Sequence, residues 1–188
     1  INSKFTKVSR VLSVKSALSK LFVFTGTGNW VEPNRWTLNE VPGNVAGDSV
    51  VIDGICTIDN LTINVGAKIT INAAKILNVT GTLTNYAGTE GLLIKSDPLL
   101  PNGSLVYASG TPLATVEMYS KASWDLIQAD GSKYSWQFFG IPFKTLLFTD
   151  YFTYGFVRQY NESSTNNDNL WTNQNDASTL TSGIGYEI

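Results

Sequence analysis

The stretch that decides the fold is VVIDGICTIDNLTINVGAKITINAAKILNVTGTLTN, residues 50–85, in which apolar side chains alternate with Thr, Asn and Lys. The alternation runs over three to five residues at a time, as in Leu61, Ile63 and Val65. A period of two places successive apolar side chains on one face of a strand, whereas a helix needs a period of about 3.6. The stretch therefore predicts several short β-strands.

The breaks between these strands, such as Asp53 with Gly54, are too short to hold a crossover helix. An antiparallel meander and a parallel β-helix both tolerate such breaks. The LTI of residues 61–63 and the LNV of residues 77–79 are related by a shift of sixteen, and the LLI of residues 92–94 follows fifteen residues later. A repeat of this size matches one coil of a small solenoid, so we expect two or three coils of a right-handed parallel β-helix.

Composition divides the chain into three zones. Residues 1–24 form a basic lead-in segment, with five Lys or Arg and no acidic residue in the first 20. Residues 25–118 hold the strand repeats, and residues 119–188 hold 15 of the 22 aromatic residues. The chain is therefore expected to be all-β, a short right-handed parallel β-helix followed by a β-sandwich-like module.

The 188 residues include no histidine. This excludes Ser-His-Asp and Cys-His catalysis as well as histidine-ligated metal sites. The single cysteine, Cys56, has no histidine to activate it, and its place in the strand pattern predicts a small buried side chain. Asp53 and Asp59 lie at tight turns, which accounts for them without a catalytic pair. We therefore expect a protein that is not an enzyme.

Charge and hydropathy restrict the partners. The net charge is −2, and because the first 20 residues are basic the remainder is acidic, which argues against nucleic acid. No run of eighteen apolar residues is present, so no membrane span is expected. The basic segment is interpreted either as a solvated lead-in or as a segment that docks the chain on a surface or assembly.

Two tryptophans, Trp30 and Trp36, precede the strand repeats. A coil stack needs its terminal coil covered, and both residues are candidates for that cap. The other hypothesis is carbohydrate binding, in which exposed indole faces of Trp30, Trp36 or Trp171 stack on sugars.

An oxygen-rich stretch covers residues 161–179. Calcium prefers oxygen ligands, and Glu162, Asp168 and Asp176 provide carboxylates there. Their spacing matches no EF-hand loop, so the alternatives are a hydrophilic surface loop and a calcium site. No other cofactor is expected.

Several motifs follow one another along the chain with a recognisable order: GNW at 28–30, PNRW at 33–36, VP at 41–42, DSVVI at 48–52, LTI at 61–63 and GA at 66–67. This pattern resembles a module of large secreted and cell-surface proteins of Bacteroidetes. Residues 124–127, WDLI, and 180–186, LTSGIGY, are similar to the β-rich module that often follows it. One departure is QADG at 128–131, where the usual member has SSP.

The resemblance implies an extracellular or cell-surface location, often with export by the type IX secretion system, and roles in adhesion, gliding or polysaccharide handling. It implies no catalytic motif. It also makes Ser49, in the sequence DSV, a candidate O-glycan acceptor. The first residue is Ile1 rather than Met, and we expect the chain to be a piece of a longer protein.

These observations together favour a non-catalytic scaffold or adhesive module whose partners are surface glycans or other surface and secretion proteins. Two alternatives stay open. One is a carbohydrate-binding or polysaccharide-processing module that uses exposed aromatic side chains. The other is a docking subunit of a surface or secretion assembly that uses its basic residues 1–20.

Overall fold

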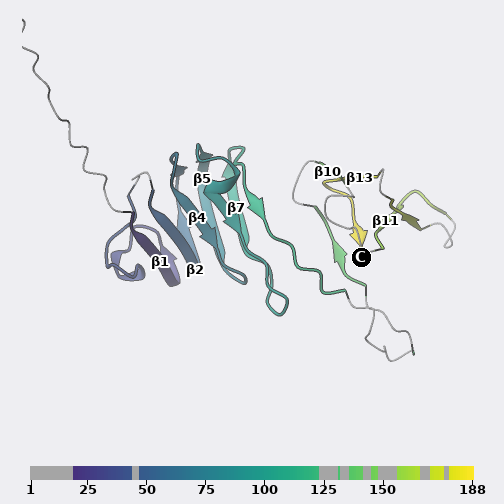
Figure 1. The fold of residues 1–188 in the computed structure, drawn as a ribbon, viewed down its shortest axis with the longest axis horizontal. Coiled ribbons are helices and arrows are strands. Elements are labelled where there is room, and N and C mark those ends of the chain that lie inside the picture. Colours follow the sequence, from purple (N-terminus) through teal and green to yellow (C-terminus); the bar gives the residue numbers. More distant parts are fainter. Residues whose placement is uncertain are drawn as a thin grey trace, which may run out of the picture.

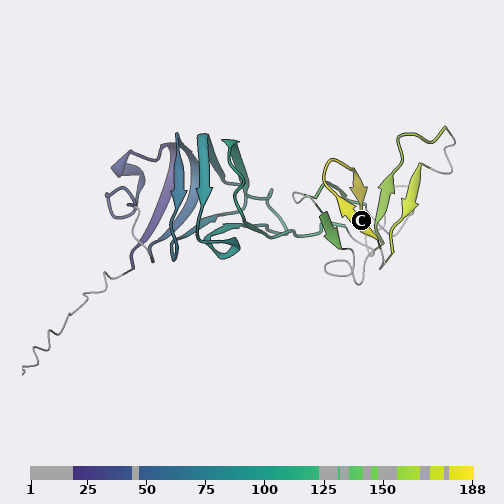
Figure 2. The same cartoon turned by 90° about the horizontal axis from the view of Figure 1, so that it is seen from above.

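The computed structural model describes residues 19–43, 47–122, 131, 136–141, 145–147, 156–165, 170–175 and 178–188. Within these ranges the protein is nearly all β, with a curled parallel sheet and a separate antiparallel part (Figures 1 and 2). The helical elements of the same ranges are two 3-10 turns, η1 (Pro33–Arg35) and η2 (Thr89–Gly91). The prediction of an all-β chain is thus confirmed. None of the described helices is long and apolar enough to cross a membrane.

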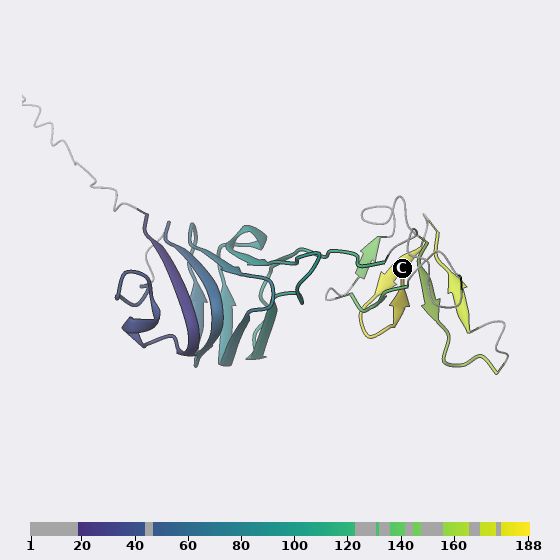
Figure 3. The ribbon, with the colours of Figure 1, turned by 90° about the horizontal axis from the view of Figure 1, so that it is seen from below.

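The parallel sheet contains the first eight strands of the chain. They are β1 (Leu21–Asn29), β2 (Ser49–Ile58), β3 (Leu61–Ile63), β4 (Lys68–Ile71), β5 (Ile76–Asn85), β6 (Leu92–Ile94), β7 (Ser104–Ser109) and β8 (Thr115–Val116). Each pairing between these strands is parallel. Figure 3 shows them side by side, coloured from purple to green along the chain.

The sheet curls because β2 pairs with two different strands. Its residues 49–52 pair with β4, and its residues 55–58 pair with β5. Gly54 lies between these halves, where an added Cβ would be 2.1 Å from the backbone oxygen of Gly26 in β1. Because only a residue without a side chain allows two backbones to approach so closely, glycine is required at this corner.

The expected repeat of sixteen residues is wrong as a pairing register. Leu61 pairs with Leu83, and Leu77 pairs with Cys56 on one side and Leu105 on the other. Paired positions are 19 to 28 residues apart, as for Ser49 with Lys68 at the short end. The similar triplets at 61–63 and 77–79 therefore belong to different pairings of the curled sheet. A three-residue alternation is compatible with either partner, so it does not determine register.

One hydrophobic core fills the concave side of this sheet. In β2, Val50, Ile52 and Cys56 are buried, while Ile55 is exposed. Burial of such an aliphatic side chain contributes about 1.5–3 kcal/mol. Buried side chains at alternate positions of successive strands stack on one another. The buried core residues are Phe22, Phe24, Trp30, Trp36, Val50, Ile52, Cys56, Leu61, Ile63, Ile69, Ile71, Leu77, Val79, Leu83 and Leu92.

The antiparallel part contains six short strands: β9 (Phe138–Phe139), β10 (Thr145–Leu147), β11 (Arg158–Tyr160), β12 (Trp171–Asn173), β13 (Thr179–Thr181) and β14 (Tyr186–Glu187). Four of them form a sheet in the order β12-β11-β14-β9, and β10 pairs with β13. A second core joins the two sheets through Ile141, Val157, Leu180 and Tyr186. The Tyr186 hydroxyl strengthens this connection by accepting a hydrogen bond from the backbone N–H of Thr181 at 2.8 Å. The change from parallel to antiparallel pairing falls between β8 and β9, and the boundary at residue 118 stays a prediction.

Candidate functional site

Both tryptophans before the repeats lie inside the core of the parallel sheet. Their ring centroids are 4.8 Å apart at an interplanar angle of 70°, and Trp36 also contacts the edges of Phe22 and Phe24. The Trp36 Nε1–H donates to the backbone oxygen of Trp30 at 2.7 Å, so the indole nitrogen is satisfied without solvent. The exposed fractions are 6% for Trp30 and 4% for Trp36. Neither residue presents an indole face to a sugar, which corrects the carbohydrate-stacking hypothesis at these two positions.

Glu32 stabilises the loop that carries the two tryptophans. Its carboxylate accepts a hydrogen bond from the backbone N–H of Asn29 at 2.9 Å and another from Arg35 Nε at 3.1 Å. The backbone hydrogen bond from Asn29, followed by the Arg35 side chain, lowers the pKa of Glu32 because both favour the ionised form. The carboxylate therefore has a local structural role in this loop.

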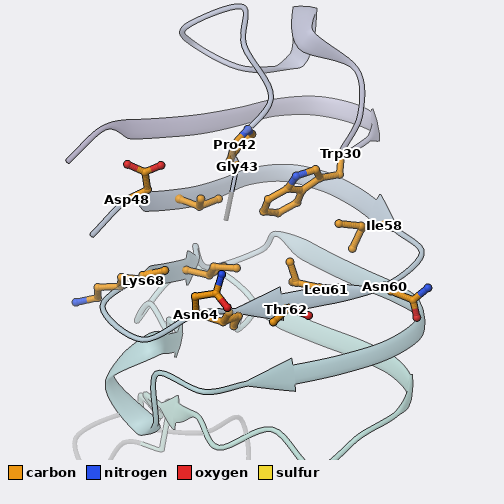
Figure 4. A pocket seen from close by; sticks show the side chains of 14 residues that line it. Trp30, Pro42, Gly43, Asp48, Ile58, Asn60, Leu61, Thr62, Asn64 and Lys68 are labelled. Carbon is orange, nitrogen blue, oxygen red and sulfur yellow. The ribbon is translucent and has the colours of Figure 1, made fainter. Parts of the chain in front are cut away.

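A small cavity of about 150 Å³ opens beside Trp30, between β2 and β3 (Figure 4). Trp30, Ile58 and Leu61 lie on its apolar side, while Asp48 and Lys68 lie at one end. Asp48 is buried and its Oδ1 accepts a hydrogen bond from the backbone N–H of Lys20 at 3.0 Å. The Asp48 carboxylate in this cavity therefore already accepts a hydrogen bond that has a structural role.

Asp53 and Cys56, two further side chains with reactive groups in the parallel sheet, also have structural explanations. Asp53 lies 3.4 Å from Lys75 Nζ and accepts a hydrogen bond from Asn72 Nδ2 at 3.3 Å. Cys56 is fully buried, and burial raises the pKa of its thiol to about 12, with the charge of Glu32 as a smaller cause. A thiol with so high a pKa is a poor nucleophile.

Trp171 lies on a face of the antiparallel sheet that is rich in aromatic side chains. Directly paired residues share a face of a sheet, and residues two apart on one strand do so too. By these rules Trp171 shares its face with Tyr160 and with Phe138. The exposed fractions are 71% for Phe138 and 40% for Tyr160, and Trp171 is half-buried. Two more exposed aromatic residues, Trp136 and Phe156, continue the same alternation. We call these five residues the aromatic face.

Arg158 lies at the centre of the aromatic face. Its guanidinium carbon is 4.1 Å from the ring centroid of Trp136 and 5.6 Å from that of Trp171. Its Nη2 forms an ion pair with Oε1 of Glu187, which is 3% exposed. Cation–π contact and ion pairing both hold the guanidinium in place, so the positive charge is compensated within the protein.

A groove of about 550 Å³ runs along part of the aromatic face. Phe138 and Trp171 come from the two edge strands β9 and β12, yet their ring centroids approach to 5.9 Å across the sheet. The ring centroids of Tyr160 and Trp171 are 5.2 Å apart. The described residues that line the groove are aromatic or glycine: Phe138, Phe139, Gly140, Tyr160, Trp171, Gly185 and Tyr186.

Of the three residues predicted to bind calcium, the structure describes only Glu162. Glu162 is exposed in a turn, whereas Asp168 and Asp176 lie outside the described residues. Among the described residues no group of three His, Cys, Asp or Glu could hold a metal ion. The calcium site therefore stays a prediction.

Ser49 and the basic segment also remain untested as functional features. Ser49 is half-buried at the first position of β2, and its backbone N–H donates to the oxygen of Lys20. Of the basic segment, residues 1–18 lie outside the described ranges, and Lys20 forms an ion pair with Glu40 at 2.9 Å. The O-glycan acceptor and the docking role stay predictions.

Most of the aromatic face is missing from the residues singled out in the sequence, which included only Trp171. One signal was present, because Trp136 with Phe138 and Phe156 with Tyr160 follow the period of a strand. The pairing that places Arg158 beside Glu187 has no such signal, since these residues are far apart in the chain.

Comparisons with protein-family models, with curated proteins and with solved structures found no match to this chain.

Proposed function

We propose that the chain is a non-catalytic contact module of a large secreted or cell-surface protein of Bacteroidetes. In this proposal the curled parallel sheet is a short right-handed β-helix that acts as a rigid scaffold, and the antiparallel part is a β-sandwich-like module that makes the adhesive contact. The resemblance of residues 24–85 supports the location and the source. The aromatic face is the observation that carries the function.

The scaffold role is supported by the way in which the parallel sheet uses its polar groups. Asp48, Asp53 and Glu32 each bind neighbouring backbone or side-chain groups within the sheet or its loop. The interior is filled by aliphatic and aromatic side chains, which fixes the relative positions of the strands. Such a layered structure keeps its shape under load and separates a contact surface from its point of attachment.

The contact role is supported by the exposure of the aromatic face. Phe138 and Phe156 are 71% and 70% exposed, so water contacts most of two large apolar side chains. Contiguous exposed apolar surface is unfavourable unless a partner covers it, and it marks interaction sites. Trp, Tyr and Arg are also the residues most enriched at the centres of binding surfaces, and Trp171, Tyr160 and Arg158 occur together here.

A surface-binding assay tests this proposal. Fluorescent beads coated with the 188-residue chain would be applied to plates coated with mucin, cellulose, chitin, peptidoglycan or collagen. We expect saturable retention on at least one coating. The variant F138S/Y160S/W171S should lose most of the retention, because it removes three rings of the aromatic face.

The matched control changes exposed aromatic residues elsewhere, Tyr86→Ser with Tyr107→Ser on the parallel sheet. Retention by the control should equal that of the unmodified chain. Equal retention of the triple variant and the unmodified chain would overturn the contact role of the aromatic face. Release of soluble sugar from any of the polysaccharide coatings would overturn the non-catalytic assignment.

A further inference from the structure

The floor of the groove on the aromatic face is made by two glycines from neighbouring strands. The β9–β14 register pairs Tyr186 with Phe139, and its continuation by one residue pairs Gly185 with Gly140. A Cβ placed on Gly185 would have no atom within 4 Å, and one placed on Gly140 would meet only the Ile184 oxygen, at 3.9 Å. Neither glycine has a left-handed backbone that would require it. Within the described part of the chain the space above them is therefore open, and no close contact there accounts for glycine at these two positions.

The walls of the groove offer flat aromatic surfaces. Tyr160 lies beside Gly185, to whose oxygen its backbone N–H donates at 3.1 Å. Trp171 and Phe138 reach over the sheet from its two edges, with their ring planes inclined by 35°. A ligand on this face therefore lies over the backbone of the two glycines and contacts the exposed surface of a connected group of aromatic rings. The groove, of about 550 Å³, is mostly open to solvent, so a ligand bound there keeps one side in water.

None of the described residues that line the groove is charged, which restricts the ligand. The nearest guanidinium on the same face, that of Arg158, is already paired with Glu187 and stacked on Trp136. An ionic ligand would lose its hydration in the groove without gaining a counter-charge. A neutral ligand with one flat apolar face avoids this loss. Its polar groups can stay in water at the open side of the groove.

We infer that the groove floored by Gly140 and Gly185 and walled by Tyr160, Trp171 and Phe138 binds a pyranose unit of a neutral glycan. A pyranose has a flat face of C–H groups for the aromatic rings, and its hydroxyls can stay in contact with water at the open side of the groove. This inference rests on the proposed contact function and names the chemical class of its ligand.

Filling the floor tests the inference, since it blocks the groove and leaves the walls in place. Gly185→Val adds a β-branched side chain next to a strand, so the variant should fold with a melting temperature equal to or above that of the unmodified chain. Isothermal titration calorimetry would use cello-, chito-, xylo- and manno-oligosaccharides, together with oligogalacturonate as a charged glycan and a polyproline peptide. We expect at least one neutral oligosaccharide to bind, with tenfold or greater weakening in Gly185→Val and less weakening in Gly185→Ala.

The matched control is Thr172→Val, which places a valine on the opposite face of the same sheet, at an exposed position. The affinity of the Thr172→Val variant for the oligosaccharide should equal that of the unmodified chain. Trp171 fluorescence should change on titration, and Trp171→Ala should abolish binding.

Unchanged affinity in Gly185→Val, no saturable binding of any neutral oligosaccharide at millimolar concentration, or tighter binding of oligogalacturonate would overturn the inference. Binding of polyproline alone would also overturn it and would assign the groove to a peptide. Retention on a collagen coating that depends on the aromatic face, without oligosaccharide binding, would contradict the inference and leave the contact function standing. Oligosaccharide binding by a chain that is retained on none of the coatings would contradict the contact function and leave the sugar-binding inference standing.

Discussion

Gly54 shows how a single absent methyl group shapes the parallel sheet. An added Cβ would lie 2.1 Å from the oxygen and 2.9 Å from the nitrogen of Gly26, so the backbones of β1 and β2 would have to separate. We expect Gly54→Ala to lower the free energy of unfolding by about 1–3 kcal/mol, as other overpacked positions do. Urea unfolding followed by circular dichroism measures this change. Gly185→Ala is the control, because its Cβ would enter open space; equal stability of the two variants would contradict the explanation.

Cys56 gives a second prediction at the scale of one residue. Its thiol is fully buried and its pKa is raised from 9.0 to about 12, so the thiolate fraction at pH 8 is on the order of one in ten thousand. Because only the thiolate reacts, we expect no labelling by a thiol reagent at pH 8 in the folded protein and complete labelling in 8 M urea, where the ordinary pKa returns. Mass spectrometry measures the modified fraction. Rapid labelling without denaturant would show that the thiol is accessible.

At the scale of elements, the sequence predicted the strands better than their partners. Alternation in residues 50–85 reports which side chains point to one face, and this local property predicted β-strands there correctly. Register depends instead on which strand lies beside which, and residues 61–63 fit residues 77–79 as well as their actual partners, 83–85. Corner glycines decide between these possibilities through close backbone contacts that no periodicity records.

The candidate site illustrates the same limit. Three tryptophans were predicted to contact sugars, yet Trp30 and Trp36 are core residues and, of the three, only Trp171 lies on the aromatic face. The strands of that sheet are two or three residues long, so each shows at most one pair of alternating aromatic residues and the sequence signal is weak. The residues that make up the aromatic face became evident only when strand pairing placed Phe138 and Arg158 on the same face of the sheet.

The loop at residues 30–36 is closed by a hydrogen bond from the indole nitrogen of Trp36 to the backbone oxygen of Trp30. Trp36→Phe keeps an aromatic ring against Phe24 but removes the donor to the buried oxygen of Trp30. A buried acceptor left without a partner costs about 1–3 kcal/mol, and we expect a loss of stability in that range. Thermal and urea unfolding measure it.

The control for this loop is Leu38→Ala, a change at an exposed side chain near Trp36, which should be close to neutral. A Trp36→Phe variant as stable as the unmodified chain would show that the hydrogen bond contributes nothing beyond the packing of the ring.

At the scale of the whole molecule, the described residues form two hydrophobic cores with no residue in common. The first lies inside the parallel sheet and the second joins the antiparallel sheets. Cooperative unfolding follows shared burial, so elements that share no core residue can open at different free energies. The described structure therefore implies two units of stability along one chain.

Paired core truncations test this division. Leu77 and Leu180 are fully buried, one in each core, and truncation of a buried leucine to alanine costs about 2–5 kcal/mol. In hydrogen exchange measured by mass spectrometry, Leu77→Ala should speed exchange in peptides from residues 49–94 and leave peptides from residues 156–188 unchanged. Leu180→Ala should do the opposite, because the lost burial weakens only the core to which the side chain belongs. Faster exchange in both groups of peptides from either variant would show that the two cores unfold as one unit, and the separation of scaffold from contact surface would then have to be abandoned.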